Sequence, residues 1–243
     1  TPGLQLAAAI DHPGGNAVGK DAGELAGLAP CGVAVGSDLA AALPGLDVMI
    51  DFSRADAVAR TADSCAAAGV ALMIGTTGLD AATLARIAAA ATKVPVLRSA
   101  NTSLALNVLL DLVQRAAGAL PAGYDIEILE AHHRHKIDAP SGTALALGEA
   151  AAAGRGEQLP RDLTLTGAQP GARTGGIGFS VVRGGDVVGE HDVRFLGAGE
   201  QLRLTHVATD RAVFARGAVA AAAWLVGRPP GYYRMADFLF EKQ

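Results

Sequence analysis

The chain has 243 residues, enough for one large domain or two modest ones. Half of the residues are hydrophobic but only 4% are aromatic, so the core must be built mainly from small aliphatic side chains. This composition excludes disorder and favours a layered protein of helices and sheets. The net charge of -4 argues against a nucleic-acid surface, because phosphate binding needs a concentrated cationic face. Small molecules are the expected partners.

The sequence gives no sign of export or of a membrane. Its two cysteines, Cys31 and Cys65, are too few for a disulfide scaffold. No run of about 18 uninterrupted apolar residues predicts a membrane span, and no signal peptide is visible. We therefore expect a soluble protein of a reducing compartment, the cytoplasm.

The first hundred residues alternate short apolar runs with alanine-rich stretches. The runs predict strands over residues 4–11, 32–35, 48–52, 71–76 and 94–97, and the stretches predict helices over residues 37–43, 55–68 and 80–92. Short apolar strands joined by crossover helices are typical of a parallel sheet that is covered on both faces. The expected fold class is α/β, with a Rossmann-like parallel sheet in the N-terminal domain.

The pattern changes after a predicted helix over residues 103–120. The remaining elements are a strand over residues 125–130, a helix over 143–153, a Gly- and Thr-rich loop to about 176, strands over 177–183, 187–195 and 201–207, and a helix over 211–226. These predict an α+β substrate-binding and oligomerisation domain with a mixed sheet over residues 104–208. Residues 1–103 and 209–243 form the predicted dinucleotide-binding domain.

The most informative segment is residues 130–144, Glu-Ala-His-His-Arg-His-Lys-Ile-Asp-Ala-Pro-Ser-Gly-Thr-Ala, which holds three of the six histidines and Lys136 at a strand end. Ser141, Gly142 and Thr143 open a helix, and N–H groups at a helix start attract a carboxylate or phosphate. Ser141 is also compatible with a simple N-cap, and the histidines with a solvated basic turn. No metal is expected, because no carboxylate or cysteine is suitably spaced to complete a zinc site.

Polar residues also follow the predicted parallel strands, where open α/β sheets bind their ligands. These strand ends are Asp11, residues 51–54, residues 75–78 and residues 99–102. An acidic residue at such a position binds a ribose hydroxyl of a dinucleotide. Each strand end is compatible with an ordinary turn, but together they favour a cofactor site.

Taken in order, residues 51–54, 75–78, Asn101, 130–144, 189–191 and 210–211 resemble the dihydrodipicolinate reductase family, also called 4-hydroxy-tetrahydrodipicolinate reductase, and the resemblance covers nearly the whole chain. It implies an oxidoreductase that reduces 4-hydroxy-tetrahydrodipicolinate to tetrahydrodipicolinate in the diaminopimelate route to lysine. The resemblance also implies a homotetramer whose first domain holds NADH or NADPH and whose second domain holds the dicarboxylate substrate.

Matched position by position, the resemblance assigns roles to individual residues. It implies that His132 is the acid/base and Lys136 the proton donor, and that the substrate carboxylates are held by His133, Lys136, Ser141, Gly142 and Thr143. The implied cofactor site comprises Asp11, His12, Gly75, Thr76, Thr77, Ser99, Ala100, Asn101 and Thr102, with Phe52, Arg54, Arg211 and Phe214 as neighbours.

Family members often carry Arg after the acidic residue, where this chain has His12. A mostly neutral imidazole attracts a 2'-phosphate less than Arg does, so we expect a preference for NADH over NADPH. The dinucleotide fingerprint lies about 20 residues before its acidic partner, a distance greater than the stretch preceding Asp11. We therefore expect a further strand, glycine-rich loop and most of a helix upstream, about 25–30 residues on the scale of a βαβ unit.

Two other functions remain open at this point. One is a truncated, cofactor-free small-molecule-binding protein on the same scaffold, suggested by the lack of a glycine-rich loop before Asp11. The other is a two-domain dehydrogenase for an amino or sugar substrate, which explains the strand ends but not residues 132–143.

Overall fold

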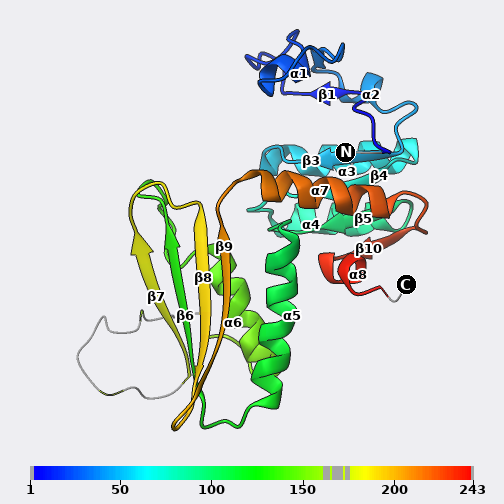
Figure 1. Cartoon of the computed structure of the whole chain (residues 1–243). Helices are drawn as coiled ribbons and strands as arrows, with labels where there is room; N and C mark the ends of the chain where they lie inside the picture. The colour runs from blue at the N-terminus through cyan, green and yellow to red at the C-terminus, as the bar shows by residue number, and fades with distance from the viewer. Residues whose placement is uncertain (1–2, 161–164, 166–171, 173–175, 242–243) are drawn as a thin grey trace. The chain divides into compact units, whose positions relative to one another are not determined.

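A computed structural model describes all residues except 1–2, 161–164, 166–171, 173–175 and 242–243. The chain forms two compact units, Thr1–Thr102 with Arg216–Gln243, and Ser103–Ala215 (Figure 1). The return into the first unit thus lies at Arg216, rather than at residue 209. Most of the Gly- and Thr-rich loop expected before residue 176 lies outside the described residues.

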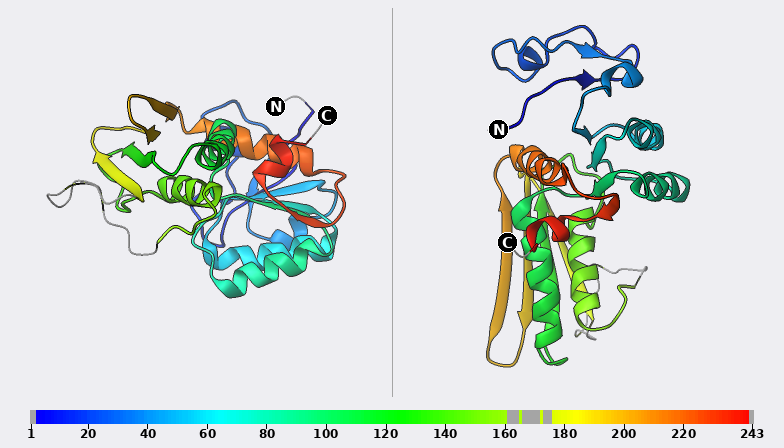
Figure 2. Two further views of the ribbon diagram at one scale, coloured as in Figure 1. Left: turned by 90° about the horizontal axis from the view of Figure 1, so that it is seen from below. Right: turned by 90° about the vertical axis from the view of Figure 1, so that its right-hand side faces the viewer.

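A four-stranded parallel sheet forms the centre of the first unit. Its strands are β3 (Val48–Asp51), β4 (Ala71–Ile74), β5 (Pro95–Arg98) and β10 (Gly231–Tyr233), in the order β10-β5-β4-β3. On one face, Leu72 and Ile74 pack in a core with α3 (Ala55–Ala68) and α4 (Ala81–Ala91). On the other face, Met73 packs with α7 (Ala212–Leu225) and α8 (Met235–Leu239) (Figure 2). The predicted parallel sheet with both faces covered is confirmed.

The first predicted strand does not join this sheet. Strand β1 (Ala9–Ile10) pairs in parallel only with β2 (Val35–Gly36), in a separate two-stranded sheet flanked by α1 (Ala22–Leu25) and α2 (Leu39–Ala42). Among the described residues neither strand is bonded to β3, so the expectation of one continuous sheet was wrong here. Strand β10 and helix α8 were not predicted, since each is too short for its hydrophobic period to be recognised.

The second unit is a mixed sheet with two helices on one face. Its strands are β6 (Asp125–His132), β7 (Ile177–Arg183), β8 (Gly189–Leu196) and β9 (Gln201–Ala208), in the order β7-β6-β8-β9. Only β6 and β7 are parallel. Helices α5 (Leu104–Ala119) and α6 (Gly142–Gly154) cover the face that carries Ile126 and Ile128 (Figure 1). No helix within the described ranges is long and apolar enough to cross a membrane.

Helices α5 and α6 pack closely because two glycines lie where they meet. A Cβ atom on Gly154 would lie 2.2 Å from the carbonyl oxygen of Gln114, and one on Gly118 would lie 2.8 Å from the carbonyl oxygen of Gly154. Both contacts are with backbone atoms, so no change of side-chain rotamer relieves them. The C-terminal ends of the two helices are therefore held against each other by a close approach that tolerates no side chain.

We predict that Gly154→Ala lowers the free energy of unfolding by about 1–3 kcal/mol, the usual cost of overpacking. Urea unfolding followed by circular dichroism measures the change. Gly123→Ala is the matched control, because nothing lies within 4 Å of the Cβ that it adds. Equal stability of the two variants would contradict the close crossing.

Candidate active site

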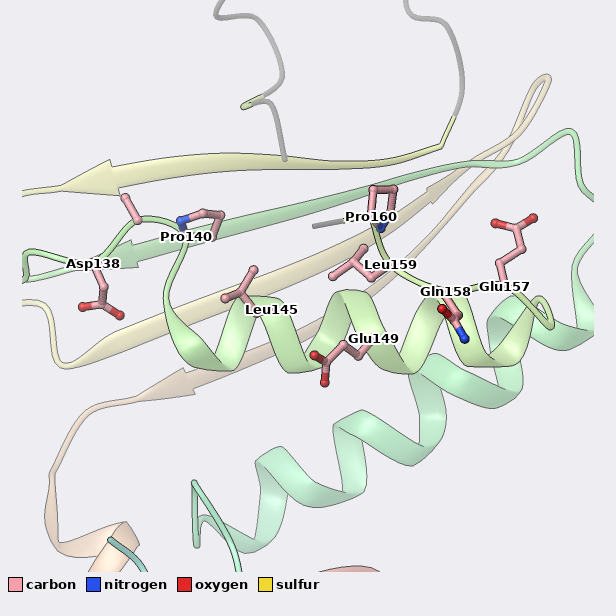
Figure 3. A pocket seen from close by; sticks show the side chains of 9 residues that line it. Asp138, Pro140, Leu145, Glu149, Glu157, Gln158, Leu159 and Pro160 are labelled. Carbon is pink, nitrogen blue, oxygen red and sulfur yellow. The ribbon is translucent and has the colours of Figure 1, made fainter. Parts of the chain in front are cut away.

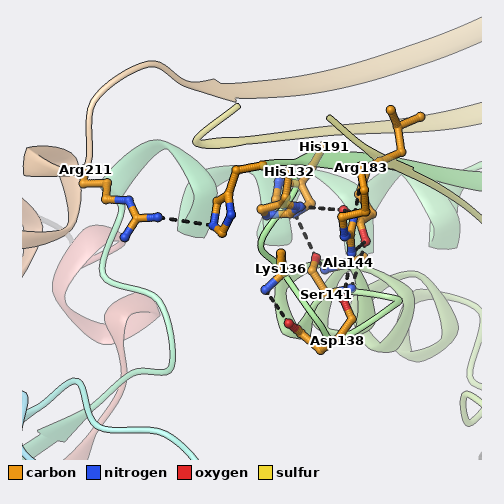
Figure 4. A network of polar contacts seen from close by, with 11 residues as sticks. His132, Lys136, Asp138, Ser141, Ala144, Arg183, His191 and Arg211 are labelled. Atoms are coloured by element: carbon orange, nitrogen blue, oxygen red, sulfur yellow. Dashed lines mark hydrogen bonds and ion pairs between the residues drawn. The ribbon is translucent and has the colours of Figure 1, made fainter. Parts of the chain in front are cut away.

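A buried carboxylate at the end of β6 holds a histidine. Glu130 and His132 lie on the same side of the strand, and the Glu130 side chain is completely buried. His132 Nδ1 lies 2.5 Å from Glu130 Oε2. Arg183, which pairs with His132 across β6 and β7, donates hydrogen bonds of 2.8 and 2.7 Å to the two carboxylate oxygens (Figure 4). The three side chains thus form one hydrogen-bonded network, built on the ion pair of Glu130 and Arg183.

This network fixes the charge of Glu130 and the orientation of the ring. Burial acts to raise the pKa of Glu130, but hydrogen bonds from Arg183, His132 and the Ser141 N–H outweigh it and hold the pKa below its usual range. An ionised carboxylate on Nδ1 favours the tautomer with the proton on that nitrogen, which leaves Nε2 to take up or release a proton. A Cβ on Gly189 would lie 3.1 Å from Nε2, so the glycine leaves space beside that atom.

Lys136 lies in the turn between β6 and α6. Its Nζ lies 2.8 Å from Asp138 Oδ1, and the lysine side chain is the more buried of the two, 22% exposed against 57%. The hydrogen bond from Lys136 is the main cause that lowers the pKa of Asp138, and the nearby Gly142 N–H lowers it least. After Asp138 the chain passes through a cis peptide bond between Ala139 and Pro140 and enters α6.

Arg211 lies beside His133 in this unit. Its Nη2 atom lies 3.3 Å from His133 Nε2. The pKa of His133 is lowered, mainly by burial and next by the charge of Arg211. Sequence reasoning placed Arg211 among the cofactor residues, but the structure groups it with the expected substrate residues. Phe214 is half-buried in the first turn of α7, where its N–H donates to the carbonyl of Arg211.

The side chain of Ser141 is an N-cap and is only 1% exposed. Its Oγ accepts from the Ala144 N–H at 3.1 Å and lies 3.2 Å from His191 Nε2. The capping alternative therefore describes this hydroxyl, and a ligand at the helix start would meet Gly142 and Thr143 first, which are more exposed. His191 packs edge-on against His132, with ring centroids 5.1 Å apart.

Sequence reasoning gave no role to Glu130, Arg183 or His191, although the first and last lie in motifs that it noted. For Glu130 a signal was present: Ile126 and Ile128 set the inward phase of the strand, and Glu130 continues it. A carboxylate in an inward position must be paired. Arg183 carried no such signal, because its partner depends on the register between β6 and β7.

Burial of His191 predicts a loss of stability in mild acid. Burial, followed by the charge of His132, lowers the pKa of His191 from 6.5 to about 3. Below pH 6.5 His191 therefore binds a proton in the unfolded chain, whereas in the folded chain it binds one only near pH 3. Stability present above pH 6.5 is lost as the pH falls, by about 1.4 kcal/mol per pH unit.

Urea midpoints measured between pH 7 and pH 5 test this. The lowered pKa values of Glu130 and Asp192 act in the same direction, but mainly below that window. We expect His191→Gln to reduce the pH slope relative to the unmodified chain, since His133 and His206 retain their smaller contributions. The same slope in both proteins would contradict the assignment.

In the first unit, three of the four polar strand ends meet at one edge of the sheet. Residues 52–54, 75–77 and 99–102 directly follow the adjacent parallel strands β3, β4 and β5. Asp51, which is buried, joins two of these turns: its Oδ1 accepts from the Ser53 N–H at 2.8 Å and from the Thr76 hydroxyl at 3.0 Å. The strand ends are therefore braced by side chains within the unit.

The expected cofactor residues differ in exposure at this edge. The ring of Phe52 is 54% exposed and crosses Gly75, whose added Cβ would lie 2.1 Å from the ring. Thr77 and Ala100 are exposed, whereas Thr76 and Thr102 are buried. Of the remaining residues, Ser99 donates to the Asn101 carbonyl at 2.6 Å, and the exposed Arg54 pairs with Asp56 at 3.2 Å.

Asp11 and His12 follow β1 and so belong to the separate two-stranded sheet. The His12 N–H donates to Asp11 Oδ1 at 2.7 Å, and the imidazole Nδ1 lies 3.1 Å from the same oxygen. The contact with the His12 side chain is the main cause that lowers the pKa of Asp11. An ionised carboxylate is thus held at the end of β1.

A pocket of about 840 Å³ lies between α6 and residues 157–160 (Figure 3). Its lining includes the carboxylates of Asp138, Glu149 and Glu157, so it is unsuited to an anion. Within the described part of the chain, no three His, Cys, Asp or Glu residues are placed to hold a metal ion. The candidate site is therefore the segment from Glu130 to Thr143 with Arg183, His191 and Arg211.

A parallel α/β unit with polar strand ends, together with a mixed-sheet unit that carries a carboxylate-held histidine and a lysine, is compatible with a two-domain nicotinamide-dependent oxidoreductase. Comparison with family models is more specific. Residues 1–102 match the N-terminal model of dihydrodipicolinate reductase, and residues 105–239 match the C-terminal model. The chain belongs to the dihydrodipicolinate reductase family.

Individual relatives agree. The chain is 54% identical to a 4-hydroxy-tetrahydrodipicolinate reductase of Anaeromyxobacter dehalogenans strain 2CP-1, over 98% of this chain and 89% of the relative. It is 50% identical to the enzyme of that name from Sinorhizobium medicae, with the same coverage. A solved dipicolinate-bound dihydrodipicolinate reductase from Paenisporosarcina sp. TG-14 has a TM-score of 0.76 at 26% identity, over 99% of this chain and 91% of that chain. An amine dehydrogenase of Mycobacterium smegmatis, with a TM-score of 0.63 at 16% identity over 95% of this chain and 88% of that chain, shares the fold alone.

Proposed function

We propose that this chain reduces 4-hydroxy-tetrahydrodipicolinate to tetrahydrodipicolinate with NADH or NADPH, in the diaminopimelate route to lysine. The observation that carries the proposal is the Glu130–His132 pair, followed in the same segment by Lys136 and the start of α6. The names of the relatives, at about half identity over nearly the whole chain, support it.

The strand ends of the first unit fit a nicotinamide cofactor. Gly75 presents backbone without a side chain next to the exposed ring of Phe52, and Asp11 offers a carboxylate of the kind that binds ribose hydroxyls. Residues 75–77 and 99–102, with Asp11 and His12, would hold the cofactor. When bound, the cofactor supplies a hydride to an unsaturated carbon of the substrate.

The residues of the second unit would bind the dianion and provide the proton. The substrate first loses its 4-hydroxyl as water, together with a proton from the neighbouring ring carbon, which creates a carbon–carbon double bond conjugated with the imine. Hydride addition to the carbon that carried the hydroxyl leaves negative charge on the adjacent carbon, which a nearby acid must protonate. Lys136 supplies that acid and attracts a carboxylate, while His132 exchanges protons through Nε2. The substrate carboxylates are also bound by His133, Gly142 and Thr143. Arg211 adds a second cation next to His133, which favours two carboxylates over one.

We further propose that NADH is preferred. The His12 ring is turned onto Asp11, so the pair presents a carboxylate rather than a free cation to the ribose. The expected result is a higher kcat/KM with NADH than with NADPH, and a shift toward NADPH in His12→Arg. A strong NADPH preference of the unmodified chain would overturn this proposal.

We also propose that the chain forms a homotetramer and is located in the cytoplasm. The face of the mixed sheet opposite α5 and α6 is not covered by any helix within the described residues, and it carries the exposed Val182 and Val207 beside the polar network of Asp192, Arg194 and Arg203. We take this face to be the surface of association. Both cysteines are free, which suits a reducing compartment. Light scattering coupled to gel filtration is expected to give the mass of four chains; a monomeric mass would contradict it.

The direct test is turnover of 4-hydroxy-tetrahydrodipicolinate, followed by loss of the reduced cofactor's absorbance. We expect turnover with this substrate and inhibition by pyridine-2,6-dicarboxylate. The cofactor-free alternative predicts that calorimetry detects the dicarboxylate but no NADH; the comparisons lend that alternative no support. Turnover of an amino or sugar substrate in place of the dicarboxylate would favour the third function.

A further inference from the structure

One carboxylate of the chain already lies where the substrate is expected. Asp138 Oδ1 lies 2.8 Å from Lys136 Nζ (Figure 4). The Gly142 N–H, in the first turn of α6, is near enough to this carboxyl to contribute to the lowering of its pKa. Lys136 and Gly142 are two of the groups that the proposed function gives to the substrate carboxylates. The contact with Lys136 joins residues only two positions apart, so the turn itself builds it.

Two further N–H donors around the helix start are engaged elsewhere. The Ser141 N–H donates to Glu130, and the Ala144 N–H donates to Ser141 Oγ. The buried His191 lies against the same hydroxyl. An incoming carboxylate that binds Lys136 therefore has to share or take over the contact that Asp138 makes with this ammonium.

The exposed fractions of Lys136 and Asp138 indicate which of the two side chains a ligand would displace. The Asp138 side chain is 57% exposed, whereas that of Lys136 is 22% exposed. Lys136 is thus the fixed partner, while Asp138 lies on the solvent side from which a ligand arrives. Because an exposed ion pair contributes little free energy, a ligand that also meets Arg211 and His133 can replace it.

We propose that Asp138 is a built-in occupant of the substrate carboxylate site, which neutralises Lys136 and the start of α6 in the free protein and is displaced when the dicarboxylate binds. The inference rests on the proposed function, because it takes Lys136 and Gly142 to be substrate ligands. Asp138 is then a positioning residue: it keeps the ammonium of Lys136 in place before binding and weakens the binding of every anion that competes for it.

Calorimetric titration with pyridine-2,6-dicarboxylate tests the proposal. We expect Asp138→Asn to bind this dianion about fivefold more tightly than the unmodified chain, the scale of one exposed ion pair. Glu149→Gln is the matched control: it removes one negative charge from α6 without touching Lys136 or Gly142, and its affinity should stay unchanged.

The side-chain carboxyl of Asp138 provides a second measurement in the unmodified protein. Its pKa, held low mainly by the hydrogen bond from Lys136, should return toward the usual range once the dicarboxylate takes over the lysine. Carboxyl-carbon NMR titration with and without pyridine-2,6-dicarboxylate measures this change.

The outcomes separate the two proposals. If the unmodified chain binds pyridine-2,6-dicarboxylate but Asp138→Asn binds it equally or more weakly, or if Glu149→Gln tightens binding as much, the displacement is wrong and the proposed function stands. If the carboxyl of Asp138 titrates identically with and without ligand, the displacement is also wrong. If the unmodified chain binds no dicarboxylate, both the proposed function and the displacement of Asp138 are wrong.

Discussion

Glu130→Gln is expected to lower kcat by about a hundredfold or more and to lower the free energy of unfolding by about 3–5 kcal/mol. Gln keeps the size of the side chain but removes the charge that faces Arg183, and its single oxygen cannot accept both from His132 Nδ1 and from the Ser141 N–H on the other side. The loss of charge leaves a guanidinium without its carboxylate, and the loss of the acceptor frees the imidazole to change its orientation and tautomer. Steady-state kinetics and urea unfolding measure the two effects.

A double variant separates these effects. Adding Arg183→Met to Glu130→Gln removes the uncompensated cation, so stability should recover in part. Turnover should not recover, because His132 still lacks its carboxylate. Recovery of turnover together with stability would show that Glu130 acts only through folding.

His132→Gln and Lys136→Ala are expected to fold normally and to lose turnover by about 10²- to 10⁴-fold, the usual contribution of a general acid or base. The two variants should differ in binding. His132 interacts with Glu130 rather than with a carboxylate ligand, so His132→Gln should retain its affinity for pyridine-2,6-dicarboxylate. Lys136→Ala removes a cation from the carboxylate site and should lose affinity as well.

Full activity in either variant would remove the acid/base assignment. Lys93→Ala is the control for loss of a lysine, since Lys93 is exposed and lies in the first unit, after α4. It should match the unmodified chain in both turnover and affinity.

The fold was predictable where the hydrophobic period was long. The bounds expected for the helix over residues 55–68 and for the strand over residues 177–183 are those of α3 and β7. Both are regular elements whose buried face repeats several times. The two-residue strands β1 and β2 pair with each other rather than with β3. The local sequence of a strand does not indicate which other strand it will pair with.

The candidate site was predictable to the extent that its residues are contiguous. Residues 130–144 stood out because titratable groups are dense there, and the structure shows contacts among them. Arg183 comes from another strand and Arg211 from the chain before α7, so their places depend on tertiary contacts. The local signals at Ser141 did not decide between cap and ligand. The structure shows that its hydroxyl caps α6 and is buried, and its role as a substrate ligand stays a prediction.

The central claim is that the segment from Glu130 to Thr143 is a dicarboxylate site with Lys136 as its main cation. Calorimetric titration of pyridine-2,6-dicarboxylate into the unmodified chain, Lys136→Ala and Lys93→Ala tests it most directly. We predict binding to the unmodified chain and to Lys93→Ala with equal affinity, and binding at least about tenfold weaker to Lys136→Ala, as for loss of a charged hydrogen bond. Equal affinity of all three proteins would contradict the claim.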